Sequence, residues 1–164
     1  MDLKNEKEAN SALEKIRNSS FNITKISTKR VKRNPLPPFT TSTLQQEASN
    51  KLSFGASRTM RIAQKLYEGI NIGSETTGLI TYMRTDGVQL STQAIDELRN
   101  EITNLHGKEY IPQTPRVYKS KAANAQEAHE AIRPTAISRH PESMSSYLDN
   151  EHFKLYELIW KRTC

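Results

Sequence analysis

The stretch TTSTLQQEASNKLSFGASRTMRIAQKLYEG, residues 40–69, decides how this sequence folds. Thr43 is followed three residues later by Gln46, a pair in which each side chain can bind the backbone N–H of the other at the start of a helix. The pair predicts a first helix over about residues 44–53, with a stop at Gly55.

A second helix is expected directly after the first. Ser57 is a favourable cap for a helix over residues 58–68, and Gly69 is placed to end it. On this helix Met60, Ala63, Leu66 and Tyr67 are expected to share one face. Two short helices joined by a tight turn are typical of a helix-turn-helix, although many such pairs do not touch DNA.

The next segments predict a β-hairpin. Residues 70–72 and 79–82 carry β-branched and apolar side chains and flank the glycine-containing turn 73–78. Two helices followed by a hairpin are the element order of a winged-helix domain. A third helix is expected from the cap at Ser91 to Gly107.

The two ends of the sequence have separate patterns. A short helix that ends in the polar cluster 18–20 and a strand over residues 21–28 are expected before the proline-rich segment 35–38, where we place a domain boundary. From Asn150 onward an amphipathic helix is expected, with Phe153, Tyr156, Ile159 and Trp160 on one side.

Composition narrows the class of protein. The 164 residues carry a net charge of +6, with a pI near 9.5 and a mean hydropathy of −0.73. No apolar run is long enough for a membrane span, no secretory signal is apparent, and the single Cys164 excludes an internal disulfide. We therefore expect a cytoplasmic protein. Basic residues cluster over 25–33 and recur at Arg58, Arg61 and Lys65, which indicates either a polyanionic partner or a solvated basic face.

The segment LITYMRTDG, residues 79–87, is the strongest candidate for chemistry. A tyrosine with the ordinary phenol pKa of about 10 is a poor nucleophile at neutral pH unless a cation or base assists it. In an extended segment Tyr82 and Arg84 point the same way, which would place a guanidinium beside the phenol. The alternative is a tyrosine on a half-buried strand followed by a solvated arginine.

A second candidate is NAQEAHEAIRPT, residues 124–135. A short helix over residues 125–132 would place His129 and Arg133 on one face, where the imidazole could relay a proton and the guanidinium could grip a phosphate. The alternative is a structural role for both. The sequence contains no phosphate-binding loop of the ATPase type and no zinc-binding pattern, so we expect neither ATP use nor a metal site in this chain.

Three motifs, taken together, resemble the type IA DNA topoisomerases, most closely the bacterial members. ITYMRTDG at 80–87 resembles the motif that holds the family's catalytic tyrosine, PPFTTSTLQQ with the following helices resembles an upstream block, and AQEAHEAIRPT at 125–135 resembles a downstream one. The motifs occur in the family's order over residues 37–135.

The resemblance implies an activity. Tyr82 would attack one DNA strand and form a 5′-phosphotyrosine link, another strand would pass, and resealing would relax negative supercoils without ATP. Arg84 would position the scissile phosphate and His129 would assist. Arg58, Arg61, Lys65 and Arg133 are the candidate DNA-binding residues. The expected partners are single-stranded and negatively supercoiled DNA, in the nucleoid, and the other domains of the same enzyme.

The resemblance also implies a fold, mainly α with a small amount of β. Residues 38–140 would form a winged-helix, CAP-like tyrosine domain, and residues 1–37 and 141–164 would belong to an arched β domain. Gly87 stands where the family has serine. The family's acidic magnesium-binding domain is absent, so we expect Mg²⁺ to be bound elsewhere in the full enzyme and this fragment alone to be inactive. The alternative is a non-catalytic winged-helix module that binds duplex DNA.

Overall fold

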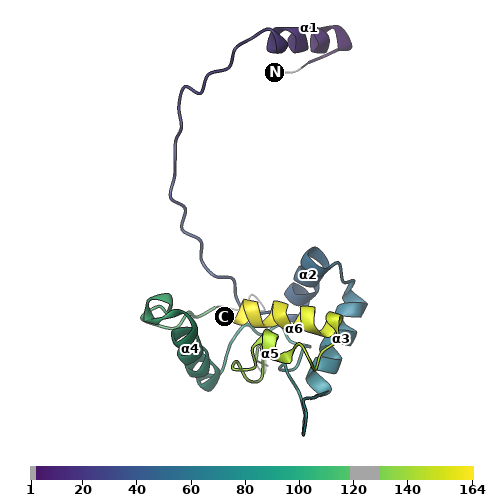
Figure 1. Ribbon diagram of the computed structural model, residues 1–164, viewed down its shortest axis with the longest axis vertical. Helices are drawn as coiled ribbons and strands as arrows, with labels where there is room; N and C mark the ends of the chain where they lie inside the picture. Colours follow the sequence, from purple (N-terminus) through teal and green to yellow (C-terminus); the bar gives the residue numbers. More distant parts are fainter. Residues whose placement is uncertain (1–2, 119–129) are drawn as a thin grey trace. The chain divides into compact units, whose positions relative to one another are not determined.

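The structure, a computed structural model, describes residues 3–118 and 130–164, which divide into the units Met1–Asn34 and Pro35–Cys164 (Figure 1). In the first unit, α1 spans Glu6–Arg17, as its apolar spacing predicts. Asn5 caps it by accepting a 2.9 Å hydrogen bond from the backbone N–H of Glu8. None of its residues is buried.

The strand expected over residues 21–28 is absent. Residues 19–38 contain no helix or strand, and the side chains of Phe21, Ile23 and Ile26 are 75%, 85% and 80% exposed. A strand needs a neighbour to accept and donate its backbone hydrogen bonds, and the described residues supply none for this segment. The β-branched composition alone was therefore an insufficient basis for the prediction.

The second unit is mainly helical with one small sheet, which confirms the expected class. Its helices are α2 Thr41–Leu52, α3 Ala56–Glu68, α4 Thr92–His106, the 3-10 helix η1 Lys108–Tyr110, α5 Pro141–Met144 and α6 Asn150–Thr163. Its strands are β1 Ile70–Asn71 and β2 Thr76–Thr77, paired antiparallel.

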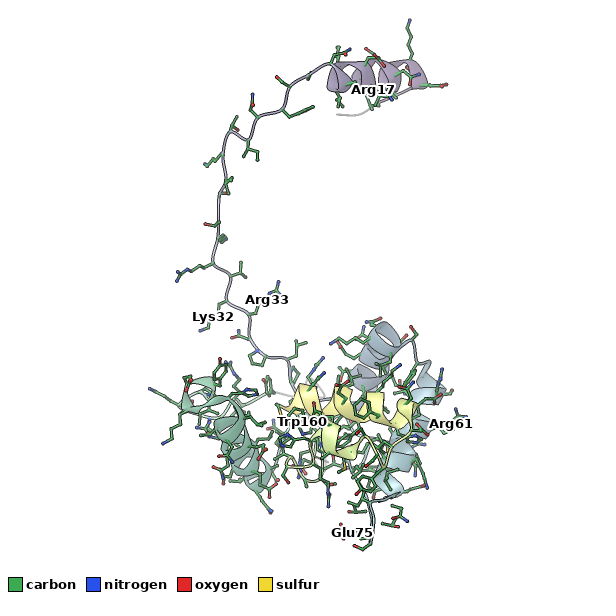
Figure 2. All side chains as sticks on the ribbon, in the orientation of Figure 1. Arg17, Lys32, Arg33, Arg61, Glu75 and Trp160 are labelled. Carbon is green, nitrogen blue, oxygen red and sulfur yellow. The ribbon has the colours of Figure 1, made fainter. Side chains whose placement is uncertain are left out.

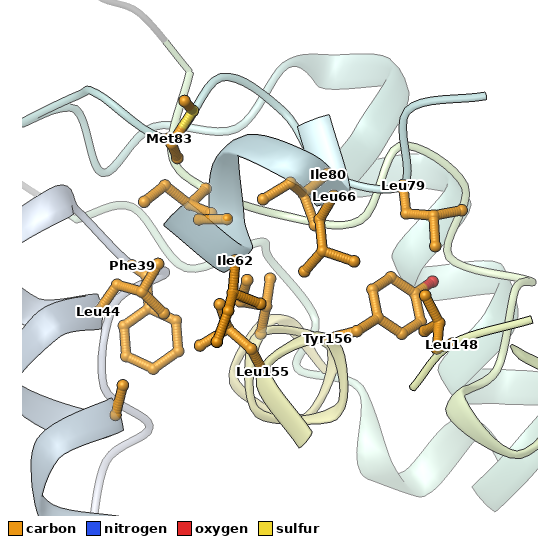
Figure 3. Close-up of a cluster of buried hydrophobic side chains, with 14 of the residues drawn as sticks. Phe39, Leu44, Ile62, Leu66, Leu79, Ile80, Met83, Leu148, Leu155 and Tyr156 are labelled. Carbon is orange, nitrogen blue, oxygen red and sulfur yellow. The ribbon is translucent and has the colours of Figure 1, made fainter. Parts of the chain in front are cut away.

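The core lies where α2, α3 and α6 pack against one another (Figure 3). Apolar side chains at helical spacing on each helix meet there, and burying them is the main force that holds the three helices together. The fully buried members include Phe39, Leu44, Ala63, Leu66, Leu79, Leu155, Tyr156 and Ile159. Helix α6 thus packs within this unit, whereas the assignment of residues 141–164 to an arched domain stays a prediction.

The helix starts differ from the predicted ones for local reasons. α2 is capped by Thr40, because the Thr40 N–H donates to Thr43 Oγ1 at 2.9 Å and the Thr43 N–H donates to Thr40 Oγ1 at 3.3 Å. Thr43 is therefore the third helical residue and not the cap. α3 begins at Ala56 after Gly55, and Ser57 already lies inside the helix.

Both predicted ends of α4 are confirmed. Ser91 accepts a 3.3 Å hydrogen bond from the Ala94 N–H, and Gly107, with a φ of 103°, follows the last helical residue. Helix α4 lies apart from α2 and α3 (Figure 1). Glu101 Oε1 and His140 Nε2, 2.6 Å apart, join α4 to the residue before α5.

The hairpin is shorter than predicted. Ile70 pairs with Thr77, and residues 79–82 form no strand. Gly78 passes so close to α3 that a Cβ there would lie 2.4 Å from the Tyr67 carbonyl oxygen. From that point the chain leaves the hairpin and runs alongside residues 132–135. The hairpin tip, at Glu75, projects away from the helices (Figure 2).

None of the helices within residues 3–118 and 130–164 has the length and apolar character needed to cross a bilayer.

Candidate active site around Tyr82

Tyr82 lies in a surface segment whose side chains alternate between solvent and core. Tyr82 is 39% exposed and Arg84 is exposed, whereas Met83 and Thr85 are buried. Alternation of this kind is expected for extended backbone and leaves both polar side chains on the solvent side. The phenol is accessible and is not part of the core.

The ring of Tyr82 meets a second exposed tyrosine. Tyr67, at the end of α3, lies with its ring centroid 5.2 Å from that of Tyr82, at an interplanar angle of 62°. Edge-to-face contact is a favoured arrangement of aromatic rings. Tyr67 is 41% exposed, so its ring is accessible from solvent beside that of Tyr82.

The backbone on both sides of Tyr82 is anchored to distant parts of the chain. Before it, Ile80 forms a bridge with Pro134 and the Thr81 N–H donates to the Arg133 carbonyl at 2.9 Å. After it, the Thr85 carbonyl accepts from the Thr41 N–H at 2.8 Å. The site is therefore assembled from three segments that are far apart in sequence.

Arg84 is the nearest cation to Tyr82 along the chain. Within the described part of the sequence, its guanidinium has no hydrogen-bond or ion-pair partner. A guanidinium presents several N–H donors in a planar fork that suits phosphate oxygens. Arg84 is therefore available to an anion that approaches this surface.

Arg133, a candidate DNA-binding residue, is engaged within the protein. Its Nε and Nη2 donate to the two carboxylate oxygens of Glu130 at 2.8 and 2.9 Å, and its Nη1 donates to the Pro134 carbonyl at 2.8 Å. Its side chain is only 15% exposed. In this structure the Arg133 guanidinium binds protein groups that hold the site together, and little of it is exposed to solvent.

Glu130 links this pair to helix α4. Its carboxylate also accepts a 2.8 Å hydrogen bond from the backbone N–H of Ser91, the α4 cap. Burial alone would raise the pKa of the Glu130 carboxyl, but the hydrogen bonds from Arg133 and Ser91 outweigh it and hold that pKa below its ordinary value. Glu130 is therefore a charged connector between α4 and the segment beside Tyr82.

His129 lies outside the described residues, as does most of the helix expected over residues 125–132. Where the chain is described again, Glu130 and Ala131 are not helical and Ile132 forms a bridge with Phe39. Pairing with Phe39 requires extended backbone, so the helix does not include these residues. Arg133 therefore does not lie on a helix, contrary to the prediction.

The basic residues of α3 differ in their surroundings. Arg58 binds the carboxylate of Glu151 on α6 and lies over the ring of Phe54, 4.6 Å from its centroid. The Arg58 hydrogen bond is the main reason that the pKa of Glu151 is lowered. Arg61 and Lys65 are exposed and have no ion-pair partner among the residues described, and Arg61 points outward (Figure 2).

The described residues contain no group of three or more His, Cys, Asp or Glu side chains placed to hold a metal ion. A cavity of about 530 Å³, lined mainly by α4, residues 110–118 and the end of α6, includes neither Tyr82 nor Arg84. This cavity is therefore not the candidate site.

The sequence and the fold have counterparts in known proteins. The family model described as DNA topoisomerase matches residues 1–164, and the chain belongs to this family. The match confirms the family indicated by the three motifs. It does not by itself assign a role to any residue.

The individual relatives are bacterial. The chain is 58% identical over 159 residues to DNA topoisomerase 1 of Rickettsia bellii, with 97% of the chain and 20% of the relative covered. It is 56% identical over 144 residues to DNA topoisomerase 1 of Xylella fastidiosa, with 87% of the chain and 18% of the relative covered. Full-length topoisomerase I of Thermotoga maritima matches in structure with a TM-score of 0.72 and 44% identity, over 93% of this chain and 24% of that one. The chain thus spans about a fifth of the length of the curated relatives.

Sequence reasoning missed several residues that shape the site. These are Thr41, Tyr67 and Thr81, which contact the Tyr82 segment or its backbone, and Glu130 in its connecting role. The three-residue spacing of Glu130 and Arg133 was a usable signal for an ion pair. No local signal identified the others, since their partners are distant in sequence.

Proposed function

We propose that this chain is the tyrosine-bearing part of a type IA DNA topoisomerase and that Tyr82 is its nucleophile. The observation that carries the proposal is the exposure of Tyr82 together with Arg84 on a backbone anchored at both ends. Membership of the DNA topoisomerase family adds support. Cleavage of a DNA strand requires a nucleophile that DNA can reach, and Tyr82 is exposed.

The reaction is a transesterification. The phenol oxygen of Tyr82 forms a bond to phosphorus and loses its proton, while the bond from phosphorus to the 3′ oxygen breaks and that oxygen takes a proton. A 5′-phosphotyrosine and a free 3′ hydroxyl result. The reverse attack by the 3′ hydroxyl reseals the strand without ATP, after another strand has passed and negative supercoils have relaxed.

Arg84 has the role of an electrostatic partner of the phosphate. Negative charge accumulates on the phosphoryl oxygens during attack, and a fixed guanidinium stabilises that charge. His129 has the role of a proton relay at the same phosphate. Its place in the proposal rests on its motif alone.

Arg61 and Lys65 provide the proposed contacts to the DNA backbone. They lie four residues apart on α3, so they share a helical face, and both are exposed. Contacts of this type are sensitive to salt and carry little sequence information. The order of α2, α3 and the β1–β2 hairpin supports a winged-helix assignment for this region.

We propose that Mg²⁺ is bound by other parts of the enzyme. The described residues lack a cluster of carboxylates that fits the ion, which prefers several oxygen ligands and bound waters. Its ligands would be carboxylates outside this chain. We accordingly propose that the 164 residues alone neither cleave nor relax DNA.

The test uses a host enzyme, defined as a bacterial DNA topoisomerase 1 in which these 164 residues replace the matching segment. With Mg²⁺ and single-stranded DNA, the host enzyme is expected to form a denaturation-resistant adduct. Tyr82→Phe should abolish the adduct, and Tyr147→Phe, at another exposed tyrosine, should not. An adduct that survives in Tyr82→Phe rejects the proposal.

The second candidate is a non-catalytic winged-helix module. The observation in its favour is the same element order with two unpaired basic side chains on α3. It requires that the isolated chain bind duplex DNA with a base preference. Weak, salt-sensitive binding to single strands without base preference would exclude it.

A further inference from the structure

We propose that the side-chain hydroxyls of Thr41 and Thr81, together called the threonine clamp, are positioning residues for Tyr82 and Arg84. The proposal rests on the proposed function of Tyr82. It adds that two hydroxyls, which do not themselves touch DNA, set the rate of strand cleavage by holding the backbone that carries the reacting side chains.

Thr81 holds the segment from the side that precedes Tyr82. Its hydroxyl donates to the Ala131 carbonyl at 2.7 Å and accepts from the Arg133 N–H at 3.0 Å. Its backbone N–H donates to the Arg133 carbonyl at 2.9 Å. One residue therefore makes three close contacts with the segment 131–133 directly before the nucleophile.

Thr41 holds the segment from the other side. Its hydroxyl donates to the Met83 carbonyl at 2.8 Å and accepts from the Thr85 N–H at 2.9 Å. Thr41 is the first residue of α2, so a helix end fixes the hydroxyl. The two contacted residues flank Arg84, and the hydroxyl thus spans the backbone that carries the guanidinium.

The threonine clamp is needed because the backbone that carries Tyr82 and Arg84 is not part of a helix or strand. Residues 81–90 form no helix or strand, and the backbone hydrogen bonds next to Tyr82 and Arg84 are single ones, from Thr81 to Arg133 and from Thr41 to Thr85, which the hydroxyls reinforce. Reacting groups must be held within a fraction of an ångström of the productive geometry, and a shift of about 1 Å can lower a rate by about a hundredfold. Hydroxyls that bond to residues 42 to 52 positions away in the sequence contribute that restraint.

The experiment replaces each hydroxyl by a methyl group in the host enzyme. Thr81→Val and Thr41→Val keep the side-chain shape and remove the donor and acceptor. Each is expected to slow single-turnover formation of the DNA adduct at saturating DNA about tenfold. The Kd for the same single-stranded DNA should change by less than about threefold, since neither hydroxyl lies on the proposed DNA contacts. Thr81→Ser and Thr41→Ser should restore the rate.

Thr59→Val is the matched control. Thr59 is buried and its hydroxyl donates to the Gly55 carbonyl at 3.1 Å, at the start of its own helix. We expect this variant to have a lower Tm. At temperatures below that Tm, its cleavage rate should equal that of the parent. If either valine variant of the clamp fails to fold, the valine and serine variants at the other position decide.

Three outcomes overturn the inference. The first is clamp valine variants that cleave at the parent rate, and the second is valine variants that lose rate only in proportion to a weakened Kd. The third is serine variants no faster than the valine variants. Tyr82→Phe separates these failures from failure of the proposed function. If Tyr82→Phe abolishes the adduct while the valine variants cleave normally, only the clamp is rejected.

Discussion

Tyr67 and Tyr82 meet edge to face with their ring centroids 5.2 Å apart, although one ends helix α3 and the other lies in an irregular segment beyond the hairpin. Gly78 permits this contact, because the chain there passes against the Tyr67 carbonyl where no side chain would fit. Helix α3 thus supplies both the exposed basic side chains and the aromatic neighbour of the candidate nucleophile.

The Tyr67 ring is expected to orient that of Tyr82. An aromatic pair of this kind contributes about 0.5–1.5 kcal/mol beyond area burial, so Tyr67→Ala in the host enzyme should slow adduct formation about two- to tenfold. Tyr67→Phe keeps the ring and should retain the parent rate. Single-turnover cleavage measures both, and an unchanged rate in Tyr67→Ala would exclude an orienting role.

Arg61 and Lys65 should contribute more to DNA binding than Arg58. Arg61→Ala and Lys65→Ala, made separately, should each reduce the slope of log K against log salt for single-stranded DNA by about 0.7. Arg58→Ala should reduce the slope less than either, because Glu151 already neutralises that guanidinium. Salt titrations of the host enzyme test the difference, and equal slopes for all three positions would refute it.

Glu130 is expected to stabilise the fold in a pH-dependent way. Its two hydrogen bonds from Arg133 and one from Ser91 are lost or weakened in Glu130→Gln, which should lower the free energy of unfolding at pH 7 by about 1–3 kcal/mol. The carboxyl has a lower pKa in the folded than in the unfolded chain. Its contribution is therefore complete above the unfolded value of 4.5 and disappears as the pH falls through the folded value.

Urea unfolding of the purified chain at several pH values measures this effect. The difference between the parent and Glu130→Gln should shrink steadily below pH 4.5. Asp96→Asn, at an exposed position of α4, is the control and should change the free energy of unfolding little at any pH. A Glu130→Gln difference that is constant with pH would show that charge is not the cause.

The Tyr156 hydroxyl is expected to stabilise the fold. Its hydroxyl is buried and donates to the Arg139 carbonyl at 2.7 Å, and burial raises the pKa of this phenol. Tyr156→Phe leaves that carbonyl without its donor and should cost about 1–3 kcal/mol of stability, whereas Tyr110→Phe, at a 67% exposed residue, should cost almost nothing. Thermal unfolding of both variants is the measurement, and equal Tm values would contradict the expected cost.

Elements with local signals were predicted best. The start and end of α4 were correct because Ser91 and Gly107 act on their own neighbours in the chain. The strand over residues 21–28 was wrong because a strand depends on a partner elsewhere. The second hairpin strand was misplaced because the close approach of Gly78 to α3 is a tertiary contact.

The amino-acid sequence alone determined the helices of the core, the family, and the expectation that Tyr82 and Arg84 point the same way on an extended segment, since periodicity, caps and motifs are written in neighbouring residues. The exposure of Tyr82 was left open by the sequence and was decided by the structure. Tertiary structure alone decided that Arg133 is bound by Glu130, that Tyr67 faces Tyr82, and that Thr41 and Thr81 hold the segment between them. Hydrogen bonds and ring contacts of this kind join residues far apart in the chain. Their partners are set by how α2, α3 and residues 130–135 pack together and not by any local pattern.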